Sequence, residues 1–265
     1  MLLNSVVIVL REVLEAALLV SVFLASARFL HVRNSWVGIA IVLGTIGAVA
    51  YGVSIQPVSD LFDGVGQEIC NAALQLMTFF LLLIVVFLIP HRINSPRNSR
   101  TIIPALMTIA VALAIAREGS EILIYVSGFW SMSNFFSAFF LGSVIGACIG
   151  CSVGVLIYYL LLAQPVQRAV PITIVLLGLI AAGMSSQATR LLIQADWVSA
   201  AGALWDSSML LSEQSLPGQL LYALIGYEAT PTATEVIVHL GSLMLVTAVF
   251  LTGRATTSRG TDDTE

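Results

Sequence analysis

The sequence contains no lysine and few charged residues of any kind. Aspartate, glutamate, lysine and arginine together make up 10% of the 265 residues, and all eleven basic residues are arginines. A soluble domain usually carries about 25% charged residues, so this chain cannot present an ordinary water-facing surface. The absence of lysine also excludes a Walker-type nucleotide-binding loop, whose lysine contacts the phosphates.

The chain also contains little cysteine and has no excess of positive charge. The three cysteines, Cys70, Cys148 and Cys151, do not form a pattern of pairs outside the membrane, which excludes a disulfide scaffold. The net charge is −4, and a chain without a basic surplus lacks the charge that nucleic-acid binding requires. We therefore expect no nucleic-acid partner.

Long apolar runs dominate what is present. Apolar residues make up 58% of the chain, and the mean hydropathy is +0.98. Because about 20 apolar residues suffice to cross a bilayer as a helix, the sequence predicts an all-α integral membrane protein with seven transmembrane helices. These lie at about 2–26, 36–55, 68–89, 102–126, 135–163, 171–193 and 235–252.

The arginines predict the orientation of these helices. Eight of them follow the first, third, fifth and seventh runs, at Arg28, Arg33, Arg92, Arg97, Arg100, Arg168, Arg254 and Arg259. All eight fall on one side of a seven-span arrangement, and that side is cytoplasmic by the positive-inside rule. The N-terminus is therefore expected outside, the C-terminus inside, and the outer face acidic.

Two copies of the motif Arg-Glu-x-x-Glu lie well inside apolar runs, at 11–15 and 117–121. A charge at the centre of a transmembrane helix costs about 2.5–3.5 kcal/mol on insertion scales. Three charges in one helix therefore cost on the order of 9 kcal/mol, unless they face one another or a wet cavity. Charged residues placed inside a membrane at such cost indicate a functional site.

The spacing of the motif places its carboxylates together. The two glutamates of each copy are three residues apart and share one helix face, while each arginine is four residues before the second glutamate. Carboxylate oxygens are the ligands that hard cations prefer. The predicted metal ligands are Glu12, Glu15, Glu118 and Glu121, with Arg11 and Arg117 as charge-compensating residues. The alternative is that these groups form buried ion pairs that fix helix packing.

The two motifs also predict an internal repeat. They lie on the first and fourth spans, which run in opposite directions, so spans 1–3 and 4–6 are expected to form an inverted repeat with span 7 added. Many secondary transporters have this architecture, with the substrate site between the repeats. We predict one transmembrane permease domain over 1–255. It divides into repeats at about 1–95 and 100–195 and an outer loop with span seven at about 196–253, and a disordered cytoplasmic tail follows at 256–265.

The paired motifs resemble those of the iron permease family, which includes fungal high-affinity permeases, bacterial oxidase-dependent iron transporters and some lead-uptake relatives. Residues 11–18 resemble the family's R-E-G-L-E-A core with Val13 in place of glycine, and residues 117–121 have Ser120 where leucine is typical. The segments Trp205–Ser208, Gly226–Ala229 and Thr234–Val236 are similar to segments of bacterial members.

The resemblance implies a non-enzymatic iron permease in the plasma membrane, a bacterial inner membrane. It implies Fe²⁺ or Fe³⁺ as transported substrate, no permanently bound cofactor, and contact with membrane lipid. A periplasmic or surface iron oxidase or peroxidase, and an iron-delivery protein, are the implied partners. The alternative substrates within the family are Pb²⁺ and Mn²⁺.

A different class of function is suggested by Cys148 and Cys151, which form a C-x-x-C pattern typical of redox chemistry. They would make the protein an intramembrane thiol oxidoreductase. Glycines four residues apart surround them, from Gly142 to Gly154, and such a stripe is typical of close helix packing. We interpret both cysteines as small residues within that packing stripe.

Polar residues near the outer side are further candidates for the pathway or for ion capture. Glu235 and His239 are four residues apart in the last span, Asp206 and Glu213 lie in the last outer loop, and Arg190 lies near the outer end of span six. Each has a plain alternative: a satisfied interior histidine, loop solvation, or an arginine at the membrane interface. Residues 216–227 are apolar but too short to span and are expected to form a re-entrant or interfacial segment.

Overall fold

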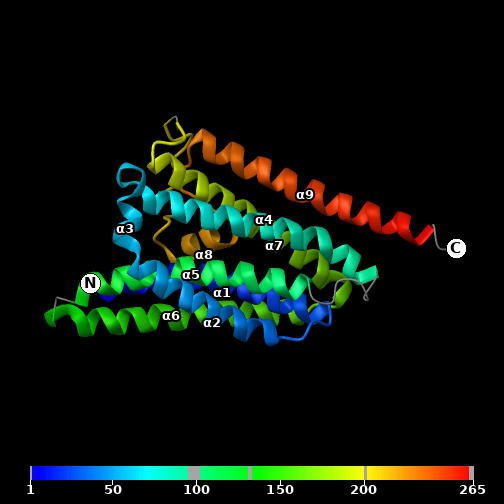
Figure 1. Ribbon diagram of the computed structural model, residues 1–265, viewed down its shortest axis with the longest axis horizontal. Helices are drawn as coiled ribbons and strands as arrows, with labels where there is room; N and C mark the ends of the chain where they lie inside the picture. The colour runs from blue at the N-terminus through cyan, green and yellow to red at the C-terminus, as the bar shows by residue number, and fades with distance from the viewer. Residues whose placement is uncertain (1, 95–101, 131–132, 200–201, 263–265) are drawn as a thin grey trace.

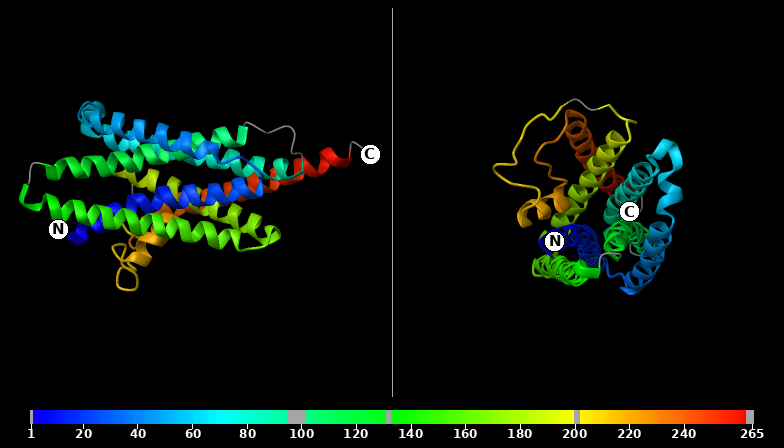
Figure 2. Two further views of the ribbon diagram at one scale, coloured as in Figure 1. Left: turned by 90° about the horizontal axis from the view of Figure 1, so that it is seen from below. Right: turned by 90° about the vertical axis from the view of Figure 1, so that its left-hand side faces the viewer.

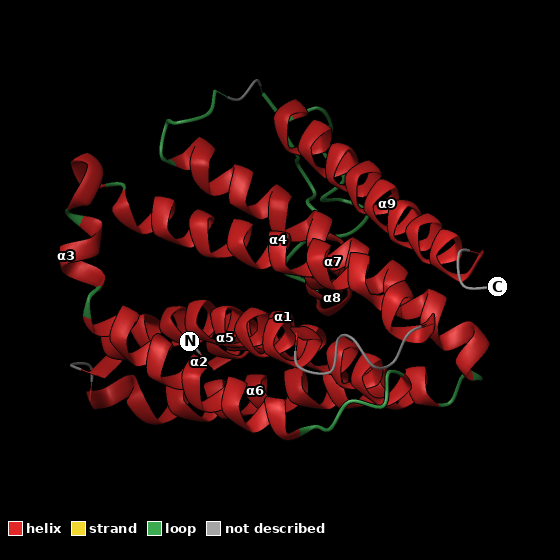
Figure 3. Ribbon diagram, turned by 45° about the vertical axis from the view of Figure 1, so that its right-hand side comes forward, coloured by secondary structure: helices red, strands yellow, loops and turns green. Residues whose placement is uncertain are grey.

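The computed structural model describes residues 2–94, 102–130, 133–199 and 202–262, and within these ranges it is helical without a strand (Figures 1 and 3). The helices are α1 (Leu2–Phe29), α2 (Ser35–Val53), α3 (Ile55–Ser59), η1 (Leu61–Gly64), α4 (Gly66–Asn94), α5 (Ile102–Trp130), α6 (Ser133–Leu162), α7 (Val166–Gln194), α8 (Leu216–Ile225) and α9 (Ala233–Asp262). The prediction of an all-α chain is confirmed.

Each of the seven predicted spans corresponds to one long helix. Six of these are long and apolar enough to cross a membrane by length and composition: α2, α4, α5, α6, α7 and α9. The seventh, α1, has 28 residues, but Arg11, Glu12 and Glu15 at its centre lower its apolar character. The protein is therefore a multi-pass membrane protein by composition, and α1 is a long helix that is mostly apolar apart from the charged motif at its centre.

The long helices lie side by side along the longest axis of the molecule (Figure 1). Helix α1 packs most extensively against α6, α2 against α5, and α4 against α7, while α9 packs on α7 and α4. The view along the bundle in Figure 2 shows α9 beside α7 at the edge of the helix bundle. The motif-bearing helices α1 and α5 also contact each other, so the two halves of the chain meet there.

Small residues explain the two closest helix pairs. A Cβ added at Gly146 of α6 would lie 2.5 Å from the Val6 carbonyl oxygen of α1, and one at Gly44 of α2 would lie 2.6 Å from the Ile115 Cβ of α5. Only glycine allows backbones to approach this closely. The glycine stripe of α6 is thus a packing surface against α1, as predicted.

The two cysteines of α6 do not belong to that packing surface. Cys148 and Cys151 are exposed on the helix. Gly146, which precedes them, and Gly150, which lies between them, are buried against α1. The interpretation of both cysteines as packing residues is therefore wrong. They are two and five residues beyond Gly146, which turns them away from the contact face of a helix with 3.6 residues per turn.

An apolar core fills the half of the bundle that lies toward the C-terminal end of α1. It contains Phe23 of α1, Val86 of α4, Met107 of α5 and Leu177 of α7, all almost fully buried. We call this region the apolar seal. It begins about two turns beyond Glu12 along α1, so the charged motif lies at its edge rather than within it.

The short helix α8 begins and ends with clear capping signals. Ser215 accepts a hydrogen bond from the Gly218 amide, and Gly226 closes the helix in the left-handed conformation. With ten residues α8 cannot span a bilayer, as expected, and it packs on α1 and α7.

The end of α9 differs from the predicted tail. The helix continues to Asp262, so a tail that is disordered from residue 256 is not observed over 256–262, and 263–265 lie outside the described residues. The Thr256 hydroxyl lies 3.1 Å from His91 Nε2 of α4 and donates to the Thr252 carbonyl oxygen. These contacts hold the start of the supposed tail against the bundle.

Candidate metal centre

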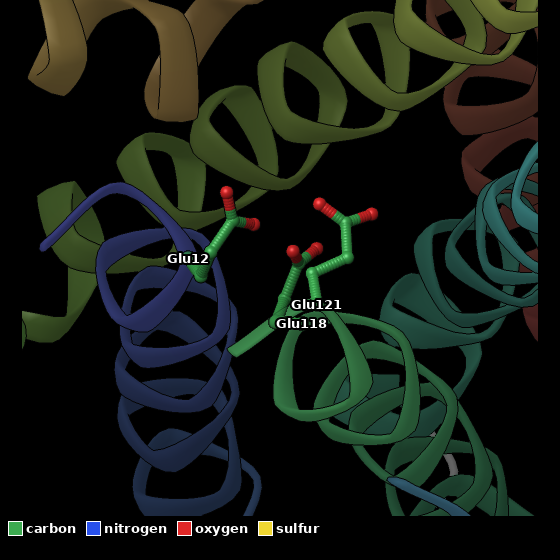
Figure 4. Close-up of side chains that lie close together, drawn as sticks. All are labelled: Glu12, Glu118 and Glu121. Carbon is green, nitrogen blue, oxygen red and sulfur yellow. The ribbon is translucent and has the colours of Figure 1, made fainter. Parts of the chain in front are cut away.

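Three carboxylates from the two motifs converge between α1 and α5. Glu12 extends from α1, and Glu118 and Glu121 extend from α5 into the same space (Figure 4). One oxygen of each lies within 4.8 Å of the other two. Glu12 and Glu118 are buried, and Glu121 is half-buried. We call these three residues the carboxylate cluster; oxygen atoms at such separations can surround one hard cation.

Arg117 is the counter-ion within this cluster. Its guanidinium donates a short hydrogen bond to Glu118 Oε1 and lies 3.4 Å from Glu121 Oε1 and 3.5 Å from Glu15 Oε2. The side chain is buried. Removing an arginine from such a position leaves buried negative charge without compensation, which is strongly unfavourable.

Glu15 and Arg11 take different positions from their counterparts in the second motif. Glu15 lies between the two arginines, with Arg11 Nε 3.7 Å from its Oε1, and does not join the three converging carboxylates. The Arg11 guanidinium lies 3.9 Å from the centre of the Tyr222 ring of α8. The predicted pairs between residues four apart therefore both exist, but only Arg117 lies inside the cluster.

Several buried oxygens around the cluster have no hydrogen-bond partner among the described residues. They are Glu12 Oε2, Glu15 Oε1, Glu68 Oε2, Asn71 Oδ1, Gln75 Oε1 and Glu118 Oε2. Buried polar atoms in native proteins are nearly always paired. An excess of oxygen acceptors over donors at one place is the arrangement that a cation or ordered water would complete.

Two cavities of opposite character reach the cluster. One has a volume of about 380 Å³, and its polar lining includes Glu12, Glu121, Glu68 and Asn71. The other, of about 560 Å³, is lined mainly by apolar residues of α1, α5 and α6, with Glu12 and Glu118 at its border. The polar cavity, which we call the vestibule, lies toward the N-terminal end of α1 and offers a route for ions.

Glu235 and His239 lie away from the carboxylate cluster. Glu235 Oε2 accepts hydrogen bonds from the Thr232 amide at 2.6 Å and from the Thr232 hydroxyl at 2.7 Å. This is a capping box at the start of α9, which accounts for the buried carboxylate. His239 is half-buried and lines a cavity of about 260 Å³ together with Glu228 and Glu235.

The remaining candidates form contacts in the loops or, for Arg190, between α7 and a loop. Asp206 is exposed, and hydrogen bonds from the Ser208 side chain and from the Ser208 amide lower the pKa of its carboxyl. Glu213 Oε1 accepts from the Ala229 amide at 2.6 Å. Arg190 Nη1 lies 3.0 Å from Glu228 Oε1. Burial raises the pKa of the Glu228 carboxyl to about 7, although Arg190 opposes this shift.

Sequence reasoning did not identify Glu68, Asn71 and Gln75 of α4 as site residues. Asn71 Nδ2 donates to Glu121 Oε1 at 3.1 Å, and Gln75 Nε2 donates to Gln187 Oε1 of α7. Their spacing of three and four residues in an otherwise apolar run is a signal that would have placed them on one helix face.

Comparison with known proteins gives a single family. Residues 103–258 match the family model described as the iron permease FTR1 family. The chain matches no curated protein and no solved structure. The matched region covers more than half of the chain and includes the second motif with Glu118 and Glu121. The chain belongs to the iron permease FTR1 family.

Proposed function

We propose that the protein takes up iron ions across the plasma membrane and that the carboxylate cluster holds the ion in transit. The convergence of Glu12, Glu118 and Glu121 oxygens within 4.8 Å of one another carries this proposal. Family membership supports iron as the transported ion. Both Fe²⁺ and Fe³⁺ accept oxygen ligands, and an iron oxidase or peroxidase acting outside would select between them.

Charge balance supports a cation at this site. Four glutamates and two arginines in the two motifs leave a formal charge of −2 when all are ionised. Arg117 partly neutralises the carboxylates through its ion pairs with Glu15, Glu118 and Glu121. An entering cation displaces Arg117 from the oxygens, so the empty transporter avoids the cost of uncompensated buried charge.

The packing of the long helices supports an inverted repeat. The first repeat consists of α1, α2 and α4, and the second consists of α5, α6 and α7. If each helix is replaced by its counterpart in the other repeat, the α1–α6 contact becomes the α5–α2 contact. The α4–α7 and α1–α5 contacts are unchanged by this replacement. The α1–α6, α2–α5 and α4–α7 contacts are the three most extensive between helices among the described residues. With α1 as the seventh span and the N-terminus outside, the carboxylate cluster lies at the repeat interface, where transporters of this architecture bind their substrates.

Inward release requires the apolar seal to open. The vestibule reaches the cluster from the N-terminal end of α1. On the other side the second cavity is lined mainly by apolar residues, and Phe23, Met107 and Leu177 are buried in the core of that half of the bundle. Rocking of one repeat against the other opens this side and closes the vestibule in a cycle of alternating access.

Iron uptake into proteoliposomes tests the proposal, with Fe²⁺ and chelated Fe³⁺ supplied separately. We expect Glu12→Gln, Glu118→Gln and Glu121→Gln to reduce uptake to the level of empty liposomes, because each removes a charged ligand of one ion. The exposed Asp63→Asn and the double variant Cys148→Ser/Cys151→Ser serve as controls with wild-type uptake. Wild-type uptake in all three glutamate variants would place the transport site elsewhere.

A further inference from the structure

One face of α4 carries a line of polar side chains beside the carboxylate cluster. Glu68, Asn71 and Gln75 follow one another at intervals of three and four residues, so they occupy successive turns of the same helix face. The side chains of Asn71 and Gln75 are almost fully buried. Buried polar groups in a transmembrane helix are costly, so a function other than solvation is required.

The amide groups of these side chains donate hydrogen bonds, but several of their oxygen atoms accept none. Asn71 donates through Nδ2 to Glu121 Oε1 at 3.1 Å, which leaves its Oδ1 buried and without a partner among the described residues. Glu68 Oε2 is buried and likewise unpaired. The hydrogen bond to Glu121 fixes the orientation of the Asn71 amide, so its free carbonyl oxygen is available to a positive ligand.

The vestibule that these residues line has the charge and size for a cation. Its walls include the carboxylates of Glu12, Glu68 and Glu121, and no arginine or histidine lines it among the described residues. A volume of about 380 Å³ accommodates roughly a dozen water molecules at about 30 Å³ each. A cation can therefore enter with much of its hydration shell.

We propose that Glu68 and Asn71 form an outer cation-binding site that loads the carboxylate cluster. A partly hydrated divalent cation first binds the Glu68 carboxylate and the Asn71 carbonyl oxygen. It then exchanges its remaining waters for Glu121, Glu12 and Glu118. Asn71 links the two sites because it also positions Glu121. This inference rests on the proposed function of the cluster and adds a second, earlier site to it.

The concentration dependence of Fe²⁺ uptake in proteoliposomes tests the outer site. Glu68→Gln removes the charge at nearly constant size, and we expect the apparent KM for Fe²⁺ to rise about tenfold while the maximal rate is retained. Glu68→Asp keeps the charge and should give a smaller rise. Asp63→Asn removes an exposed carboxylate that does not line the vestibule and should leave KM unchanged.

The outcomes separate this proposal from the proposed function. If Glu68→Gln has the wild-type KM while Glu12→Gln and Glu121→Gln abolish uptake, the outer site is refuted and the cluster stands. An equal rise of KM in Asp63→Asn would also refute it, because surface charge alone would then explain the effect. Monodisperse elution in detergent identifies folded variants, and Glu68→Asp supplies the test if Glu68→Gln does not fold.

Discussion

Arg11 and Arg117 hold the same place in the two motifs but are used differently. Arg117 is buried among three glutamates, whereas Arg11 is partly exposed and lies over the Tyr222 ring. An aromatic ring attracts a guanidinium over its face. Tyr222 therefore helps to hold Arg11 beside Glu15 and outside the carboxylate cluster, and α8 takes part in setting the charge of the site.

Without the Tyr222 ring, Arg11 should compete with the ion for the carboxylates of the cluster. For Tyr222→Leu we expect the apparent KM for iron to rise by up to about 30-fold, the factor that corresponds to a desolvated cation–π contact of about 2 kcal/mol. Tyr222→Phe keeps the ring and should behave like the wild type. The measurement is the iron-concentration dependence of uptake in proteoliposomes. A higher KM in the Phe variant as well would assign the effect to the hydroxyl rather than the ring.

At the scale of helices, the α1–α6 contact depends on backbone proximity. Gly146→Ala places a Cβ 2.5 Å from the Val6 carbonyl oxygen, and overpacking of this kind costs about 1–3 kcal/mol. For a chain of this size we expect a fall in Tm of at least about 2 °C, measured by thermal unfolding in detergent.

The matched control for this variant is Gly241→Ala in α9, where an added Cβ meets no atom within 4 Å. This substitution should leave Tm unchanged or raise it, because alanine favours helix over glycine by about 1 kcal/mol. Equal losses of Tm in the two variants would mean that close α1–α6 packing does not determine stability.

The sequence was sufficient to predict the helices but not all of their contacts. Apolar runs and interrupting charges predicted seven long helices, and two copies of a costly motif predicted that Glu12, Glu15, Glu118 and Glu121 lie together. Three of these carboxylates converge, whereas Glu15 lies between the two arginines. Glu68 and Asn71 were missed because a polar residue near the end of an apolar run also fits ordinary solvation. Their role depends on the packing of α4 beside α5, which no local pattern encodes.

The exposed cysteines illustrate the same limit. The glycine periodicity of α6 correctly predicted a packing face, but the position of Cys148 and Cys151 relative to that face depends on which glycines contact α1. Likewise, Glu235 fits a metal ligand by spacing, but its contacts with Thr232 show that it caps α9.

Across the whole molecule, acidic loop residues such as Asp63 and arginines that follow long helices, such as Arg33, lie at opposite ends of the bundle, and this predicts how it sits in a membrane. In a background with Cys70, Cys148 and Cys151 replaced by serine, Asp63→Cys should react with an impermeant maleimide added outside intact cells. Arg33→Cys should react only after the membrane is permeabilised, because it lies at the opposite end of α1 from the N-terminus. Both positions are exposed in the protein, so access alone decides the result.

The reverse labelling pattern would invert the proposed orientation and make the vestibule open to the cytoplasm. Labelling of both positions in intact cells would contradict a membrane-spanning bundle. Either result is read directly from the labelled protein on a gel, without any measurement of transport.

The apolar seal has an electrical consequence. A continuous water-filled pore lets ions pass without any rearrangement of the protein, but the second half of the bundle is packed around the buried side chains of Phe23, Met107 and Leu177. The cavity of about 560 Å³ that extends along α1 in this half is lined mainly by apolar residues, which disfavour a hydrated ion. Each ion therefore waits for the seal to rearrange, and such motions take microseconds to milliseconds or longer. In a planar bilayer the protein should give no single-channel currents, and the membrane resistance should stay high at every iron concentration.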